Sequence, residues 1–248
     1  MIHIITYGDE KFNEGKKRIF NQANNTGWFD VVTLYGPEDL DSEFIEKFKY
    51  VLQCPKGGGY YIWKPYIVNK HLEKMQDNDI LIFLDAGCSI NPQGINRFNE
   101  YIDSLNKSDE GCISFYMCPD NPDGIMEKRW TIKEIFEYFN IDINSDLAKS
   151  RQSYAGVLIF KKNSKSINIV NLWLKAVYDN PLLFTDYYNN DNQCYEFKDS
   201  RHDQSILSII CKLNDVIKLD DETFFPPDGN FGGEQSLKYP FWATRIRE

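Results

Sequence analysis

The segment from Ile80 to Cys88 constrains the fold of this chain more than any other part of it. It reads Ile-Leu-Ile-Phe-Leu-Asp-Ala-Gly-Cys, so a run of five apolar residues leads directly into Asp85. A continuous apolar run of this length is typical of a strand that helices cover on both faces of a parallel sheet. Because open α/β sheets bind ligands at the carboxyl ends of their strands, the sequence predicts that Asp85 lies in a site.

Asp85 also has a structural interpretation, in which it caps the turn after the strand with the help of Gly87. The functional alternatives are a contact to a nucleotide ribose or to a divalent cation. Mg²⁺ or Mn²⁺ bound to a diphosphate needs one or two protein carboxylates, because phosphate oxygens and water supply its other ligands. The position at a strand end favours a site.

Apolar strand-like runs alternate with helical periodicity along the whole chain. Strands are expected at 2–7, 30–35, 80–84, 112–117, 154–160 and 216–219. Helices are expected at 12–23, 42–50, from 64 toward 75, and at 94–105, 131–139, 166–178 and 201–212. This alternation predicts an α/β fold with a mostly parallel central sheet and helices on both faces. No repeat or linker divides the chain, so a single Rossmann-like domain is expected over residues 1–248, with 220–248 as a candidate lid or tail.

Composition excludes some classes of protein. Of the 248 residues, 42% are hydrophobic and 15% aromatic, which is ample for a core and argues against disorder. The net charge of -9 argues against a general nucleic-acid binder, which needs an excess of Lys and Arg to neutralise phosphates. An anionic small ligand stays open, because a local pocket can be basic on an acidic protein.

The sequence shows no targeting segment. Its start lacks the basic leader and apolar length of a secretion signal, and no apolar stretch approaches the ~20 residues of a membrane span. The six cysteines contain no Cys-x-x-Cys pair, and several lie within apolar runs. Reduced, packed thiols are therefore favoured over zinc ligands or disulfides. A soluble cytoplasmic protein is predicted, with peripheral attachment to a membrane as an open alternative.

A second polar cluster, Arg201-His202-Asp203-Gln204, opens an apolar helical segment. Asp203 suits an N-cap or first-turn acid, which the helix dipole stabilises. That role leaves Arg201 and His202 unexplained. A helix start flanked by Arg and His also suits an anionic or sugar ligand, and the two roles are compatible.

Two further segments carry candidate ligands for a phosphate. The three glycines at 57–59 indicate either a close approach to another group or a flexible surface turn. Their spacing does not match the Gly-x-x-x-x-Gly-Lys-Ser/Thr phosphate loop, but Lys64 follows closely and has the reach to bind a phosphate. In the C-terminal tail, Lys238, Arg245 and Arg247 suit either a lid over a diphosphate or an ordinary docked terminus.

Taken in order, three segments resemble the GT-A-type glycosyltransferases, which use nucleotide-sugar donors. Ile80–Cys88 is similar to their strand with an acidic motif, usually Asp-any-Asp, that binds donor ribose, diphosphate and metal. Ser153–Phe160 is similar to a strand of small residues near their sugar pocket. His202–Leu207 is similar to the Asp-Gln helix start of retaining members, such as the glycogenin-like and galactosyltransferase groups. Gly59–Pro65, together with Asp85–Cys88, also resembles segments of uncharacterised glycosyltransferase-like proteins of bacteria and large viruses.

The resemblance, which spans about residues 2–215, implies roles for individual residues. The candidate donor-binding residues are Thr6, Tyr7, Lys64, Asp85, Ala86, Gly87, Arg201, Arg245 and Arg247. The candidate catalytic residues, at the sugar, are His202, Asp203 and Gln204. Asp85 is also the candidate metal ligand, for Mn²⁺ or Mg²⁺. The sequence departs from the family at Gly87, which stands where the second acid of Asp-any-Asp is expected, and this departure puts metal dependence in doubt.

The implied activity is transfer of a sugar from a nucleoside diphosphate sugar to a hydroxyl of a glycan or lipid-linked acceptor, as in polysaccharide biosynthesis. If Asp203 is a general base, the reaction inverts the anomeric configuration. If Asp203 only positions the sugar, retention of the configuration is expected. The resemblance favours retention. One alternative is a non-catalytic nucleotide- or carbohydrate-binding protein, which Gly87 favours. Another is a sugar nucleotidyltransferase, although residues 8–12 lack the glycine-rich signature that such enzymes carry.

Overall fold

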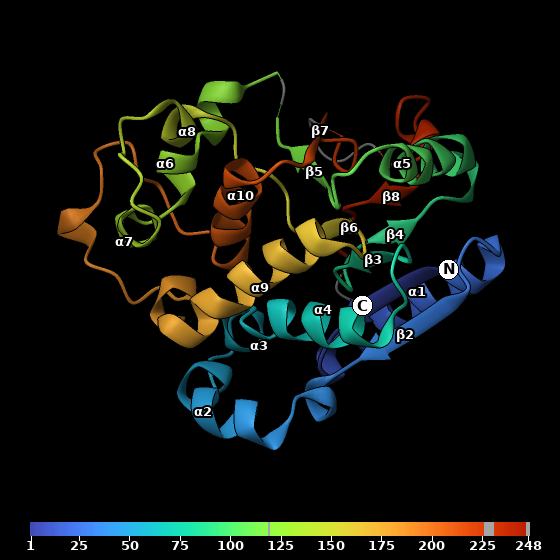
Figure 1. Cartoon of the computed structure of the whole chain (residues 1–248), viewed down its shortest axis with the longest axis horizontal. Helices are drawn as coiled ribbons and strands as arrows, with labels where there is room; N and C mark the ends of the chain where they lie inside the picture. Colours follow the sequence, from blue (N-terminus) through green and yellow to red (C-terminus); the bar gives the residue numbers. More distant parts are fainter. Residues whose placement is uncertain (119, 226–230, 247–248) are drawn as a thin grey trace.

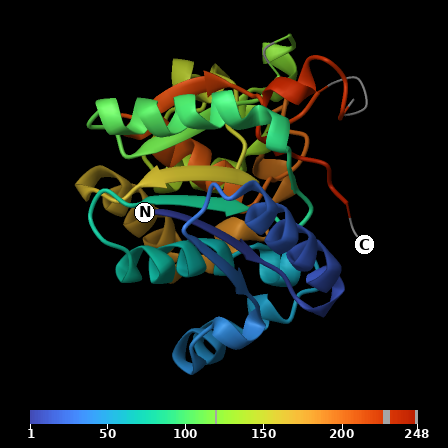
Figure 2. The same ribbon diagram turned by 90° about the vertical axis from the view of Figure 1, so that its right-hand side faces the viewer.

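A computed structural model describes residues 1–118, 120–225 and 231–246 of the chain. The strands of the main sheet are β1 (Ile2–Tyr7), β2 (Val31–Tyr35), β3 (Ile80–Leu84), β5 (Cys112–Tyr116), β6 (Val157–Lys161) and β7 (Ile217–Asp220). Within the described residues they form a six-stranded sheet in the order β2-β1-β3-β6-β5-β7. Helices cover both of its faces (Figures 1 and 2). The predicted α/β fold with a mostly parallel sheet is confirmed.

One strand of the sheet is reversed. β1 runs parallel to β2 and β3, and β5 parallel to β7. β6 is antiparallel to both of its neighbours, with Val157 opposite Leu84. The strand begins at Val157 rather than at the expected residue 154, so residues 154–156 lead into it. Because β6 is reversed, this entry segment lies beside the carboxyl end of β3.

Among the described residues, seven α-helices lie close to the predicted segments, and three α-helices of four residues each were not predicted. In chain order the helices are α1 (Asn13–Thr26), α2 (Ser42–Leu52), α3 (Gly57–Tyr60), α4 (Trp63–Lys74), α5 (Ile95–Lys107), α6 (Glu127–Trp130), α7 (Lys133–Tyr138), α8 (Asp146–Lys149), α9 (Ser164–Asp179) and α10 (Asp203–Leu213). Two short strands that the sequence did not predict, β4 (Ser89–Ile90) and β8 (Phe241–Trp242), pair with each other. None of the helices described is long and apolar enough to cross a membrane.

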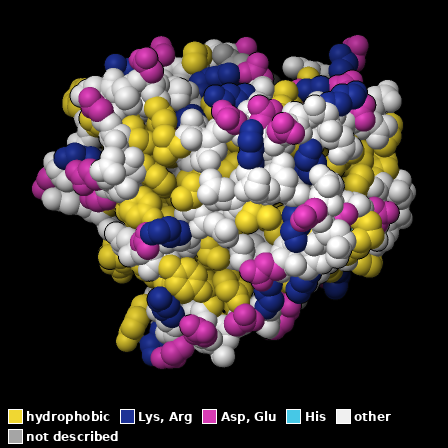
Figure 3. Space-filling model, viewed as in Figure 1, with side chains coloured by type: hydrophobic (Ala, Val, Ile, Leu, Met, Phe, Trp, Pro, Cys, Tyr) yellow, Lys and Arg dark blue, Asp and Glu magenta, His cyan; other side chains and the backbone are white. Residues whose placement is uncertain are grey.

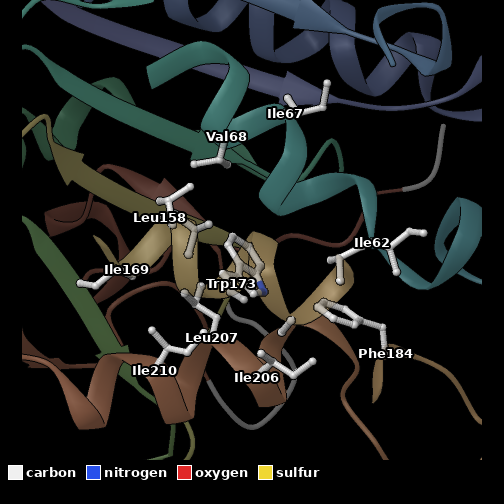
Figure 4. Packing of buried hydrophobic residues seen from close by; sticks show 14 of the residues in the cluster. Ile62, Ile67, Val68, Leu158, Ile169, Trp173, Phe184, Ile206, Leu207 and Ile210 are labelled. Atoms are coloured by element: carbon white, nitrogen blue, oxygen red, sulfur yellow. The ribbon is translucent and has the colours of Figure 1, made fainter. Parts of the chain in front are cut away.

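Among the described residues, the buried apolar side chains form two clusters, one on each face of the sheet. Leu81 and Phe83 of β3 point into one cluster, and Ile82 and Leu84 into the other, so both faces of β3 are buried as predicted. α4, α9 and α10 cover the first face, where Figure 4 shows Trp173 of α9 between side chains of α4 and α10. α1 and α5 cover the second face.

The triple glycine forms an ordered left-handed turn ahead of α4. Gly57, Gly58 and Gly59 have φ values of +59°, +57° and +95°, a region that residues with a Cβ rarely adopt. A Cβ on Gly59 would lie 2.6 Å from Cα of Leu52. Of the two sequence-based interpretations, the structure shows a close approach of backbone to backbone. The indole nitrogen of Trp63 donates to the Gly57 carbonyl at 2.9 Å, which fixes the start of α4.

Candidate functional site

Three segments far apart in the sequence meet at the carboxyl end of β3. The ammonium of Lys64, in the first turn of α4, lies 3.0 Å from Asp85 Oδ1 and 2.9 Å from Asp203 Oδ2. It also donates to the carbonyl of Ala155 at 3.2 Å. The ammonium therefore forms two ion pairs and one hydrogen bond to a carbonyl. We call Lys64, Asp85 and Asp203 the Lys64 cluster.

Each member of the cluster is positioned by the end of a regular element. Asp85 follows β3, and a turn closed by the amide of Cys88 on the Asp85 carbonyl, at 2.8 Å, holds it there. Its own amide donates to the carbonyl of Gly156 at 2.9 Å, which ties β3 to the entry segment of β6. Asp203 is the first residue of α10, where the helix dipole favours a negative charge.

The cluster combines deep burial with one open side chain. The side chains of Lys64 and Asp203 are 3% and 6% exposed, whereas that of Asp85 is 34% exposed. Burial alone would lower the pKa of Lys64, but the charges of Asp203 and Asp85 outweigh it and raise that pKa. Burial raises the pKa of Asp203 to about 6, although pairing with Lys64 opposes the rise. The cluster pairs one cation with two carboxylates, so its formal charge is negative, and Asp85 is the member open to solvent.

Gln204 is held from behind by a chain of buried polar side chains. Its Oε1 accepts from the Ala155 amide at 3.3 Å, and its Nε2 donates to Gln152 Oε1 at 2.7 Å. Gln152 is fully buried and donates to Glu127 Oε2 at 3.0 Å and to Thr131 Oγ1 at 3.1 Å. Gln152 and Glu127 were not predicted, because single polar residues outside a periodic segment form no pattern.

His202 lies behind the cluster rather than at its open side. The residue is 5% exposed, and its Nδ1 lies 2.8 Å from the carbonyl of Phe184. Its ring packs beside that of Tyr60, with centroids 5.2 Å apart. Burial lowers the pKa of His202, so the imidazole is neutral at pH 7. This arrangement fixes the start of α10 and offers no open face to a ligand.

The C-terminal tail crosses the turn that follows β3. The amide of Ile246 donates to the Gly87 carbonyl at 3.1 Å, and the Thr244 hydroxyl donates to the same carbonyl at 2.7 Å. Figure 2 shows the tail passing the edge of the sheet opposite the N-terminus. Arg245 therefore lies next to this turn. Arg247 and residues 226–230 of the expected lid lie outside the described residues.

Thr6 and Tyr7, two of the expected donor-binding residues, are buried. Thr6 has no exposed surface, and Tyr7 stacks on Trp63 with ring centroids 3.8 Å apart. A hollow of about 570 Å³ instead begins directly after β1. A Cβ built on Gly8 would lie 3.6 Å from Cβ of Ala86, so the hollow adjoins the turn after β3. Its lining residues are Gly8, Asp9, Glu10, Lys11, Asn13, Lys16, Pro37 and Glu38.

Tyr154 and Gly156, in the entry segment of β6, complete the surroundings of Asp85. A Cβ on Gly156 would lie 2.8 Å from Asp85 Oδ2 and would overlap the hydroxyl of Tyr154. Glycine is therefore needed for the tyrosine and the aspartate to approach each other. The sequence analysis noted the small residues of this segment but did not identify Tyr154 as part of the site.

This arrangement of strands matches that of a solved glycosyltransferase. A glycosyltransferase involved in the glycosylation of the major capsid of PBCV-1 superposes with a TM-score of 0.53 and 13% identity, over 97% of this chain and 92% of that chain. The fold is that of a GT-A-type glycosyltransferase. The galactosyltransferase LgtC, in complex with donor and acceptor sugar analogues, has a TM-score of 0.46 at 13% identity, over 96% of this chain and 83% of its own. No family model and no curated protein matches the sequence.

A GT-A fold raises the question of a divalent cation. The position of the second acid is Gly87, and a Cβ there would lie 3.3 Å from Cα of Arg245 in the tail. One oxygen each of Asp85 and Asp203 is paired with Lys64. Among the residues that the structure describes, no three His, Cys, Asp or Glu side chains are grouped to hold a metal. The residues present therefore do not fit a two-carboxylate site of the Asp-any-Asp type.

Proposed function

We propose that this chain is a glycosyltransferase that moves a sugar from a nucleoside diphosphate sugar to a hydroxyl of a glycan or lipid-linked acceptor. The observation that carries the proposal is the Lys64 cluster, which holds Asp85 and Asp203 together at the strand ends. Apolar residues often replace a buried ion pair without loss of stability, so a cluster at this place supports a ligand site. The GT-A fold supports the class of ligand by analogy.

The proposed role of Asp85 is to bind donor hydroxyls. One of its oxygens is held by Lys64, and a third of the side chain faces solvent. In glycosyl transfer the sugar passes through an oxocarbenium-like state while negative charge builds on the departing diphosphate. The net negative charge of the cluster is suited to a cationic sugar ring, and nearby arginines are suited to the leaving group.

Retention of configuration is part of the proposal. A general base has to contact the acceptor hydroxyl whose proton it takes. The side chain of Asp203 is 6% exposed and already paired with Lys64, which supports a positioning role. The expected result for Asp203→Asn is a fall in activity without a change in anomeric product, as measured by NMR.

A donor screen tests the proposal. The purified chain is incubated with nucleoside diphosphate sugars, with and without Mn²⁺, and release of the nucleoside diphosphate is measured. At least one donor is expected to be consumed, and Asp85→Asn should slow its consumption about 10- to 100-fold, as for loss of a charge-assisted hydrogen bond. Asp103→Asn, on the exposed side of α5, is the matched control. Consumption that is unaffected by Asp85→Asn would contradict the assignment of the site.

Gly87 favours a second candidate, a nucleotide- or carbohydrate-binding protein without turnover. The same screen discriminates between the two. A nucleoside diphosphate sugar that raises the melting temperature but is never consumed, with any acceptor or metal, would support the binding protein.

A further inference from the structure

Two arginines beside the Lys64 cluster lack a carboxylate partner among the residues that the structure describes. The guanidinium of Arg201 lies 4.1 Å from the centre of the Trp130 ring, and that of Arg245 lies 4.9 Å from the centre of the Phe224 ring. Across residues 1–118, 120–225 and 231–246, no carboxylate oxygen lies within 4.0 Å of either guanidinium. We call Arg201 and Arg245 the arginine pair.

Arg201 is half-buried next to the candidate catalytic residues. Its Nη1 lies 3.2 Å from the sulfur of Met117, and Gln204 Nε2 lies 3.4 Å from the same atom. Burial lowers the pKa of Arg201, and the charge of Arg245 acts in the same direction. Withdrawing a guanidinium from water without a counter-ion is unfavourable, so an anion bound at this place would lower the free energy of the protein.

Arg245 approaches the same place from the tail. The residue is exposed, and its backbone has a φ of +56°, in the left-handed region that arginine seldom adopts. The hydrogen bond from Ile246 to Gly87 holds this part of the tail against the turn after β3. The charge of Arg245 also acts on Tyr154, which adjoins Asp85. The arginine pair therefore adjoins the open side of the Lys64 cluster.

We infer that the arginine pair binds the diphosphate of the donor directly, with no divalent cation between the protein and the phosphates. The inference rests on the proposed function. A guanidinium forms two parallel hydrogen bonds with phosphate oxygens, so two guanidinium groups suit two phosphates. The place of the usual second acid is taken by Gly87 under the tail, and Lys64 already pairs with one oxygen of each carboxylate that would otherwise hold a cation.

Inorganic pyrophosphate tests the arginine pair independently of the base and the sugar. Titration calorimetry of the full chain in EDTA should show pyrophosphate binding, which Arg201→Gln and Arg245→Gln each weaken about 10- to 100-fold. Arg201→Lys keeps the charge without the planar fork and should weaken binding less. The matched control is Arg151→Gln, because Arg151 is paired with Asp220 at 2.6 Å. This control should change the affinity by less than about threefold.

Two results would overturn the inference: binding that requires Mn²⁺, or binding in EDTA that both glutamine variants leave unchanged. Circular dichroism checks that each variant is folded. If Arg201→Gln is not folded, the pyrophosphate affinity of Arg245→Gln, a substitution at an exposed position, decides whether the inference holds. A different result would show that the proposed function is wrong. The arginine pair would then bind pyrophosphate and nucleoside diphosphates in EDTA, while no nucleoside diphosphate sugar is consumed.

Discussion

At the scale of single residues, Lys64 holds two acidic segments together. Replacing it by methionine leaves the buried carboxylate of Asp203 without its cation and close to Asp85. Removing one partner of a buried ion pair costs about 3–5 kcal/mol, so Lys64→Met should lower the free energy of unfolding by that amount. Urea unfolding measures the effect. Adding Asp203→Asn to Lys64→Met should recover part of the loss, and a methionine variant as stable as the wild type would contradict the role given to Lys64.

Gly156 allows a second prediction at this scale. In Gly156→Ala the new methyl group would overlap the Tyr154 hydroxyl and crowd Asp85. Forcing an extra methyl into a packed place costs about 1–3 kcal/mol, and the displacement of Asp85 should also weaken donor binding. Thermal unfolding and calorimetry measure the two effects. Adding Tyr154→Phe removes the nearest atom and should restore stability in part; no recovery would mean that the crowding lies elsewhere.

At the scale of elements, the sequence predicted the strands better than their directions. The apolar run of β3 identifies a strand buried on both faces, because few other structures need such a run. The antiparallel direction of β6 was not predictable, because an apolar run reads the same in either direction. β4 and β8 have two residues each, too few to show a period.

The same limit applies to the site. The family resemblance implied that Asp85 and Asp203 serve one donor site, and the structure brings the two side chains together around Lys64. The sequence analysis placed Lys64 at a phosphate, whereas the structure places its ammonium between the two carboxylates. The spacing of residues does not reveal which way a side chain turns in the first turn of a helix. Gln152, in an irregular segment, gave no signal at all.

The chain of polar residues behind Gln204 links α6 to α10. Gln152→Ala would remove one of the two hydrogen bonds to Glu127 Oε2, and it would leave Gln204 Nε2 with only the weak acceptor sulfur of Met117. An unsatisfied buried polar group costs about 1–3 kcal/mol, so this variant should lose at least that much stability in urea unfolding. Gln76→Ala, at an exposed position, is the control and should stay within about 0.5 kcal/mol of the wild type. Equal stability of the two variants would mean that water replaces the lost bonds.

At the scale of the whole molecule, ionisable side chains lie inside the protein as well as on its surface. On the face shown in Figure 3, acidic and basic side chains are interspersed rather than gathered by sign. Two groups of buried polar side chains lie at opposite ends of the parallel strands. The Lys64 cluster is at the carboxyl end of β3, and His3 lies near the start of β1, with its Nδ1 3.0 Å from Nε2 of His71. The Tyr35 hydroxyl lies 2.9 Å from Nδ1 of His71.

These histidines make stability depend on pH. Burial, with smaller effects of His3 and Lys74, lowers the pKa of His71 from 6.5 to about 4. Between these two values the unfolded chain binds a proton that the folded chain does not, so the folded state loses stability as the pH falls below 6.5. Asp203 acts in the opposite sense. Its pKa is raised to about 6, so between that value and 3.8 the folded chain holds the extra proton.

Because the two groups oppose each other, the contribution of His71 has to be measured as a difference between wild type and His71→Gln. A glutamine does not titrate, so the stability of the variant relative to the wild type should rise by about 2 kcal/mol between pH 7 and pH 5. Urea unfolding at half-unit steps of pH measures both proteins. The difference should be constant above pH 7, where the imidazole is neutral in both states. Parallel curves down to pH 5 would mean that His71 takes up its proton in the folded protein, and that the polar network at the start of β1 opens to water before the sheet unfolds.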